Sequence, residues 1–314
     1  MRLRVWSEFL RFEELRSSRV LNLLARYDVG VCVQVSAFEG LAPVLRAHAE
    51  HGLEPAVWLL LPKHHGYWPS ERNAELYAAR VEALLSWAAR ERVQVPWLAV
   101  DLERPLWQAQ MLDRAYGLAK SLAQLGLAAA NLNPRRFARA QAAYQAMAAR
   151  AHDAGVRLLC AAHDYVLDDL LAGSNLLQDL HEVPVLGGPW DALSLMLYTS
   201  LGCERRSLYE AARELRLRLG DRAAASIGLT GAGVLGTEAH YTRPEDLAPD
   251  VAALKAAGVR DVAIYSLEGI LSSREPQAWF ESALAAAPRV PEPTPASYRT
   301  ARRKRLLRLL LRTL

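Results

Sequence analysis

The chain has 314 residues, of which 52% are hydrophobic and 23% charged, and a formal net charge of +4. This length allows two average domains or one large α/β barrel, and the composition is typical of a globular protein with a sizeable core. No run of 18 apolar residues occurs, and the N-terminus reaches Ser7 and Glu8 too early for a signal peptide. We therefore expect no transmembrane helix, no signal peptide and a cytoplasmic protein.

Positive charge is concentrated at the C-terminal end. Residues 299–314 contain seven Arg and Lys side chains and no acid, so residues 1–298 carry a net charge of −3. A mildly acidic body does not indicate a nucleic-acid surface, and we expect no nucleic-acid partner for it. Three scattered cysteines, Cys32, Cys160 and Cys203, are too few for a disulfide framework or a zinc site and are compatible with a reducing compartment.

Short apolar strands alternate with helical segments along the chain. Strands are predicted at 3–9, 29–36, 56–61, 97–103, 156–162, 193–199, 225–230 and 261–267. Helices are predicted at 41–51, 71–90, 108–125, 135–154, 207–219 and 245–257. Glycines that favour a left-handed cap fall at or just after helix ends, at Gly52, Gly126, Gly155, Gly220 and Gly258.

Eight such repeats favour an α/β fold with a single (β/α)8 barrel over residues 1–287. A doubly wound open sheet is the alternative. Neither a GxGxxG motif nor a P-loop follows any of the predicted strands, which argues against nucleotide binding, and we expect no cofactor and no resident metal.

Two carboxylates follow the fourth apolar run. Asp101 and Glu103 are separated by one residue, so in a strand both side chains point to the same side, about 6–7 Å apart at the backbone. Two carboxylates this close cannot both ionise freely, so the pKa of one should rise, as a general acid requires. A salt-bridged strand end or a helix cap is the structural alternative.

Polar residues also occupy the other predicted strand ends, where the active sites of such barrels form. In the sixth strand Ser194, Met196 and Tyr198 share one face and three leucines take the other, so we expect Met196 and Tyr198 to point inward. The polar strand-end residues are Ser7, Glu8, Gln34, Ser36, Lys63, His64, His65, Asp101, Glu103, His163, Asp164, Tyr165, Tyr198, Thr199, Ser200, Thr230, Ser266 and Glu268.

These motifs resemble glycoside hydrolase family 18, the chitinase-like barrels. The Asp-x-Glu of Asp101 and Glu103, the Met-x-Tyr of Met196 and Tyr198, and the segment 264–268 match in order. The resemblance implies that Glu103 is the general acid, that Asp101 orients the acetamido group of an amino sugar, and that Tyr198 helps to hold that group.

The sequence departs from this family at two points. Pro96 and Ala99 stand where the family has two further aspartates, and Tyr265 stands where it has a tryptophan. A retaining double displacement would instead need a second carboxylate about 5–5.5 Å from Glu103, for which Glu268 and Asp164 are the candidates.

We therefore expect a glycoside hydrolase-like protein that acts on a glycan or an amino-sugar oligosaccharide. The alternatives are a noncatalytic carbohydrate-binding barrel and a metal-dependent sugar isomerase or lyase, in which Glu103, His163, Asp164 and Glu268 would ring a divalent cation. Aromatic rings near strand ends can pack against sugar faces. The predicted substrate-binding residues are Glu268, Tyr265, Asp164, His163, Gln34, Trp68, Trp190 and Met196.

The C-terminal end is predicted to be a separate unit. Four prolines indicate an extended linker over 288–298, followed by a short basic amphipathic helix over 299–314. Leu307, Leu310, Leu311 and Leu314 would form its apolar stripe. Such a helix can bind an anionic membrane, which would place the protein at the inner membrane face, or it can dock on the barrel.

Overall fold

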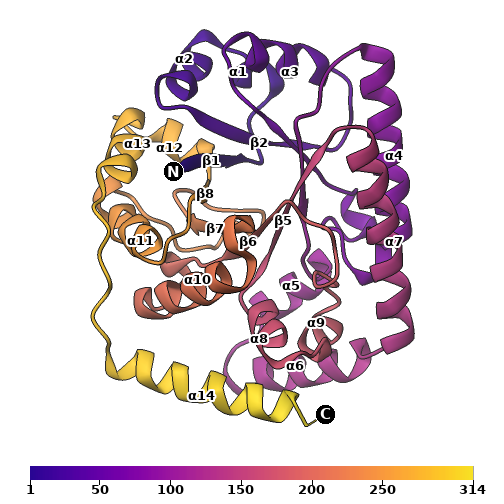
Figure 1. Cartoon of the computed structure of the whole chain (residues 1–314), viewed down its shortest axis with the longest axis vertical. Coiled ribbons are helices and arrows are strands. Elements are labelled where there is room, and N and C mark those ends of the chain that lie inside the picture. Colours follow the sequence, from indigo (N-terminus) through magenta and orange to yellow (C-terminus); the bar gives the residue numbers. More distant parts are fainter. Residues whose placement is uncertain (314) are drawn as a thin grey trace.

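The computed structural model describes residues 1–313, and its centre is a closed barrel of eight parallel strands in chain order (Figure 1). β1 pairs with both β2 and β8, which closes the barrel. The predicted (β/α)8 barrel is confirmed, and an open sheet is excluded. The strands are β1 (Arg2–Ser7), β2 (Val29–Val35), β3 (Ala56–Leu59), β4 (Trp97–Asp101), β5 (Arg157–His163), β6 (Ala192–Met196), β7 (Ala223–Gly228) and β8 (Asp261–Tyr265).

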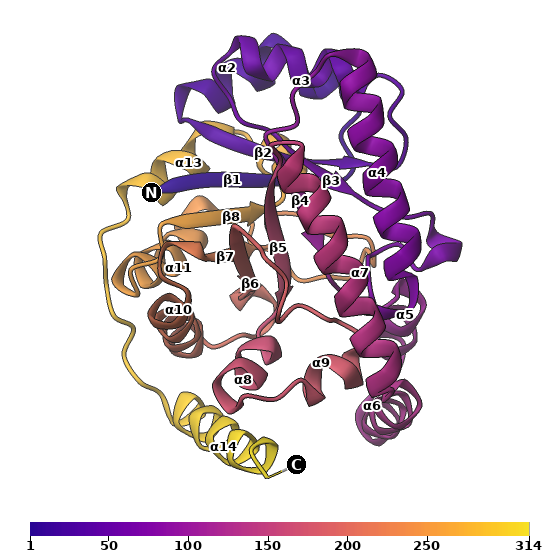
Figure 2. The same ribbon diagram turned by 45° about the vertical axis from the view of Figure 1, so that its right-hand side comes forward.

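Helices form a ring outside the strands (Figure 2). No helix within residues 1–313 combines the length and apolar character needed to cross a membrane. The helices are α1 (Phe12–Leu15), α2 (Ser18–Arg26), α3 (Leu41–Glu50), α4 (Ala74–Glu91), α5 (Leu106–Asp113), α6 (Gly117–Asn131), α7 (Pro134–Asp153), α8 (Tyr165–Ala172), α9 (Leu176–His181), α10 (Arg205–Leu219), α11 (Pro244–Ala256), α12 (Leu267–Ser272), α13 (Pro276–Ala285) and α14 (Pro295–Leu311).

Strand alternation divides the core into two layers. Leu193 and Leu195 of β6 pack outward in the layer between strands and helices. Ser194 lies inside the barrel, where its hydroxyl is 2.9 Å from that of Ser226 on β7, and the indole of Trp6 donates to Ser226. The inward direction predicted for the Ser194, Met196 and Tyr198 face therefore holds for Ser194, because side chains alternate along a strand.

Several element boundaries differ from those predicted. The expected helix 108–125 is two helices, α5 and α6, because the chain turns at Tyr116, which is extended, and at Gly117, which has a φ of 52°. Gly126 is therefore not a cap but lies inside α6. β4 ends at Asp101 and β6 ends at Met196, so Glu103 and Tyr198 lie on the loops that follow.

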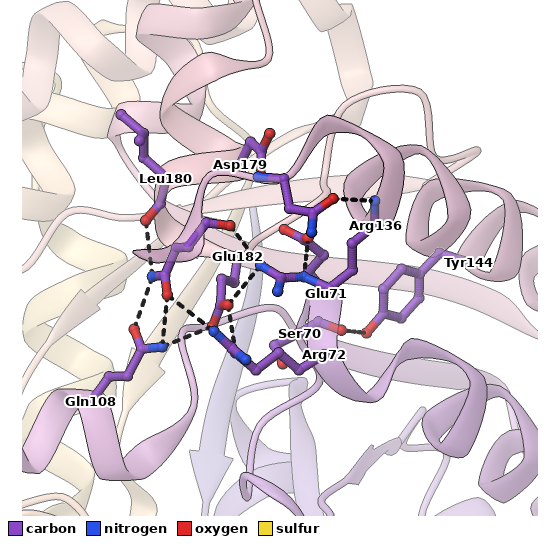
Figure 3. Close-up of polar contacts among 11 residues, drawn as sticks. Ser70, Glu71, Arg72, Gln108, Arg136, Tyr144, Asp179, Leu180 and Glu182 are labelled. Atoms are coloured by element: carbon purple, nitrogen blue, oxygen red, sulfur yellow. Dashed lines mark hydrogen bonds and ion pairs between the residues drawn. The ribbon is translucent and has the colours of Figure 1, made fainter. Parts of the chain in front are cut away.

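A buried polar network ties α5 and α6 to the helices around the barrel (Figure 3). The Arg136 guanidinium on α7 donates to Glu71 at 2.5 Å and to Glu182 at 3.0 Å. Glu182 also accepts from Gln108 of α5 at 2.8 Å, and Gln108 in turn accepts from Asn131 at the end of α6 at 3.2 Å. The network fixes the position of the α5–α6 segment, which extends the loop after β4.

The C-terminal helix begins inside the segment expected to be a linker. Pro295 occupies its first turn and the Thr294 hydroxyl caps it by accepting from the Ser297 amide, which explains the earlier start. The helix docks through cations, since Lys304 reaches Asp164 at 2.5 Å, and only part of the predicted leucine stripe joins this contact. Within that stripe Leu311 is buried and Leu310 is exposed, and Leu314 lies outside the described residues.

Candidate functional site

An open cavity of about 380 Å³ lies at the C-terminal end of the barrel. The strands contribute Trp6, Trp58, Asp101, Met196 and Tyr265 to its lining. His163 at the end of β5 also lines the cavity, and the loops that follow the strands add Glu8, Trp68, Glu103 and Tyr198. The cavity therefore combines aromatic rings with carboxylates at the end of the fold where barrel enzymes place their active sites.

A larger groove of about 520 Å³ lies outside the barrel mouth, beside α4 and α7. Its lining includes Trp107 together with His64 and His65, which the sequence placed at a strand end. Two of its other polar side chains, Glu71 and Arg136, are already paired with each other. We place the candidate site in the barrel cavity because the carboxylates predicted for chemistry lie there.

Asp101 and Glu103 both line this cavity, although only Asp101 belongs to β4. The alternation continues past the strand because the Leu102 amide still donates to Ala161 on β5, at 2.9 Å. The Glu103 amide turns away to the carbonyl of Pro69. Burial, together with the nearby Glu103 and Glu8 carboxylates, raises the pKa of Asp101 well above its usual value. Its surroundings therefore favour the protonated form of Asp101.

Glu103 contacts a histidine of the neighbouring strand β5. Its carboxylate lies 3.2 Å from Nε2 of His163, and the two side chains are 15% and 40% exposed. His163 is the last residue of β5, whose Ala161 pairs with Asp101 in the neighbouring strand. The contact holds Glu103 at the wall of the cavity while leaving it open to a ligand.

Glu8 also lines this cavity, although the sequence indicated for it only a position at a strand end and no role in the site. Its carboxylate accepts the hydroxyl of Tyr67, at 2.5 Å, and that of Tyr265. Burial raises the pKa of Glu8, although the two tyrosine donors oppose the shift. The alternation of side chains along β1 could have predicted this position. Glu8 lies two positions after Trp6, which points into the barrel, so Glu8 should point to the same side.

Three of the predicted residues complete the aromatic and apolar wall. Trp68 and Met196 line the cavity, and so does Tyr198. Burial and the nearby carboxylates Asp101, Glu103 and Glu8 raise the pKa of Tyr198, so its hydroxyl stays protonated and can donate a hydrogen bond.

Some buried polar atoms of the cavity lining have no hydrogen-bond partner within residues 1–313. They are Nε1 of Trp58, Oδ1 of Asp101 and Oε2 of Glu238. Buried polar groups are almost always paired, so donors and acceptors left open here fit a ligand that is itself polar.

Four predicted substrate-binding residues do not line the cavity. Glu268 accepts from the Ser7 hydroxyl and from two backbone amides, so it holds the loop after β1. Asp164 pairs with Lys304 of α14. Trp190 is buried in the outer layer and donates to the Val185 carbonyl. Gln34 is half-buried on β2, outside the cavity lining.

The ring of metal ligands in the alternative hypothesis is not assembled. Glu268 and Asp164 are engaged away from Glu103 and His163. In the described part of the chain, no group of three or more His, Cys, Asp and Glu side chains is placed to hold a metal ion. The arrangement of these residues therefore does not support a metal-dependent isomerase or lyase.

Comparisons with known proteins show the fold. No protein-family model and no curated protein sequence matches the chain. A chitinase from Chromobacterium violaceum aligns with a TM-score of 0.56 and 12% identity, over 90% of this chain and 99% of that one. A GH18 chitinase from Pseudoalteromonas aurantia aligns at 0.55 and 9%, over 90% and 100%.

A third similar structure is the PgaB (BpsB) glycoside hydrolase domain from Bordetella bronchiseptica. It aligns with a TM-score of 0.52 and 10% identity, over 90% of this chain and 98% of that domain. At these identities the likeness shows the (β/α)8 barrel fold alone, and residue roles depend on the site itself.

Proposed function

We propose that this protein is a glycoside hydrolase-like enzyme that acts on an amino-sugar oligosaccharide. The observation that carries the proposal is the placement of Asp101 and Glu103 together in an aromatic-lined cavity at the barrel mouth. Trp58, Trp68 and Tyr265 offer ring faces for the apolar side of a sugar. The distant chitinases of the same architecture are consistent with this assignment.

In the proposed reaction Glu103 donates its proton to the glycosidic oxygen, and the bond between the anomeric carbon and this oxygen breaks. The carbonyl oxygen of the sugar's own acetamido group attacks the anomeric carbon, held by the protonated Asp101 and the Tyr198 hydroxyl. Water then attacks the same carbon, the bond from that carbon to the acetamido oxygen breaks so that the acetamido group is regenerated, and the Glu103 carboxylate takes a proton from the water. Atoms and charge balance without any added co-reactant.

A double displacement would need a second carboxylate as the nucleophile, and the positions of the candidate carboxylates favour the substrate-assisted route instead. Glu268 and Asp164 lie outside the cavity lining. Glu8 lies inside it, but tyrosine hydroxyls already occupy its carboxylate, which makes it a poor nucleophile. An acetamido group supplied by the substrate removes the need for an enzyme nucleophile.

The test is the leaving-group dependence of Glu103→Gln. With a chitooligosaccharide the variant should lose about 10²–10⁴-fold in kcat, because the leaving oxygen must be protonated. With a dinitrophenyl N-acetylglucosaminide the loss in kcat should be small, because the dinitrophenolate group leaves without being protonated. Glu82→Gln, at an exposed position on α4, is the matched control.

Two outcomes would contradict the proposal. If Glu103→Gln lost kcat equally on both substrates, Glu103 would not be the general acid. Tight binding of the oligosaccharide by the unmodified protein without any turnover would favour the noncatalytic carbohydrate-binding barrel instead.

A further inference from the structure

Helix α6 presents an apolar face that nothing within residues 1–313 covers. Leu118, Leu122 and Leu125 follow a helical spacing of four and three residues, so they share one face. They are 76%, 60% and 68% exposed. Asn131, at the very end, is the one buried residue that the structure shows for this helix. A contiguous exposed apolar stripe of this kind marks an interaction surface.

Helix α14 also has an outer face of mixed character. Lys304 and Arg308 point toward the barrel, where both reach Asp168. The opposite side of the helix carries the exposed rings and chains of Tyr298, Leu306 and Leu309. Exposed arginines lie between them, at Arg299, Arg302, Arg303 and Arg305.

These two faces lie on the same side of the molecule. α6 packs on α9, α9 packs on α8, and α8 packs on α14. Both helices follow the lower edge of the protein in two views that differ by 45° (Figures 1 and 2). Their outer faces therefore belong to one surface, here called the α6–α14 face.

We propose that the α6–α14 face docks on an anionic lipid bilayer. Its charge supports this occupant, since residues 295–313 contain seven cations and no acid, and α6 contains one lysine and no acid. Leucines that enter the lipid boundary, flanked by arginines that meet phosphate groups, are typical of interfacial helices. A second copy is the poorer occupant, because a two-fold contact would bring like-charged arginines together.

Docking in this way would place the rim of the barrel mouth close to the membrane, with α6 between the lipid and the cavity. Lys120 and Gln124 of α6 line the cavity, so the helix that carries the leucine stripe also forms part of the cavity rim. This consequence rests on the proposed function: the substrate would be a glycan presented at a bilayer.

The test is flotation of the full chain with phosphatidylcholine vesicles that contain 30% phosphatidylserine. We expect binding to these vesicles, little binding to pure phosphatidylcholine, and weaker binding in 0.5 M salt. Arg302→Gln with Arg303→Gln should lower the partition coefficient about 25-fold, roughly fivefold for each cation. Arg222→Gln with Arg260→Gln, exposed positions just before β7 and β8, should leave it unchanged.

A second variant tests the α6 half of the surface. Leu122→Gln with Leu125→Gln should lower vesicle binding about tenfold while circular dichroism stays that of the parent. Binding of this variant at the parent level would overturn the role of α6. Absence of binding to anionic vesicles, or full binding by the variant that lacks Arg302 and Arg303, would overturn the whole proposal.

Light scattering tests whether a second copy of the chain, instead of a membrane, covers the α6–α14 face. A concentration-dependent dimer that Leu122→Gln with Leu125→Gln disperses would assign the face to a second copy and overturn membrane docking. Glu103→Gln should bind vesicles like the parent. Failure of the proposed catalysis and failure of docking are thus distinguishable.

Discussion

Arg136 is the residue of the buried network whose removal should destabilise the protein most. It is 19% exposed, and both of its partner carboxylates, Glu71 and Glu182, have fully buried side chains. Arg136→Met keeps most of the volume but leaves those carboxylates without this cation. Breaking a buried ion pair from one side costs about 3–5 kcal/mol in the free energy of unfolding.

The same helix offers a matched control. Arg150 of α7 pairs with Glu82 at 3.0 Å, and these side chains are 62% and 48% exposed. Arg150→Met should cost about 0–1 kcal/mol, because solvent screens exposed pairs. Guanidinium unfolding followed by tryptophan fluorescence measures both variants, and an unchanged slope shows that the midpoints can be compared.

A further variant checks the cause. Glu71→Gln in the Arg136→Met background removes a buried carboxyl group that has lost its partner and should restore part of the lost stability. The reasoning would be refuted if Arg136→Met and Arg150→Met cost the same, since burial of the partners would then not matter.

Three further predictions concern the pH dependence of stability, the cavity and the tail. Burial raises the pKa of Glu71 to about 7, so the native state binds this proton more tightly than the unfolded state does. The free energy of unfolding, measured relative to Glu71→Gln, should therefore fall by about 3 kcal/mol as pH rises from 4.5 to 8. Parallel stability curves from urea titrations would contradict this. Tyr265→Phe removes a donor to Glu8 and should raise its pKa further, measured by carboxyl ¹³C NMR; an unmoved midpoint would show that the hydroxyl contributes nothing. Asp168→Asn weakens the docking of α14 and should speed trypsin cleavage within residues 299–308 about tenfold with the barrel intact, whereas an unchanged rate would place the docking energy elsewhere.

The amino-acid sequence by itself determined the architecture of this protein. Apolar strands with alternating faces and helices with glycine caps are local patterns, so eight repeats were enough to predict the barrel. Local parity likewise predicted that Asp101 and Glu103 would share one side, and both line the cavity although β4 ends between them. That Glu103 acts as an acid stays a prediction.

Only the tertiary structure decided which polar residues remain available to a ligand. Ser7 and Glu268 are 261 residues apart, yet their hydrogen bond occupies a carboxylate that looked free in the sequence. Lys304 similarly occupies Asp164 from the far end of the chain. Periodicity reports the direction of a side chain from its own strand or helix, whereas the partner that meets it comes from a distant segment, and that partner sets its burial, its charge and its pKa.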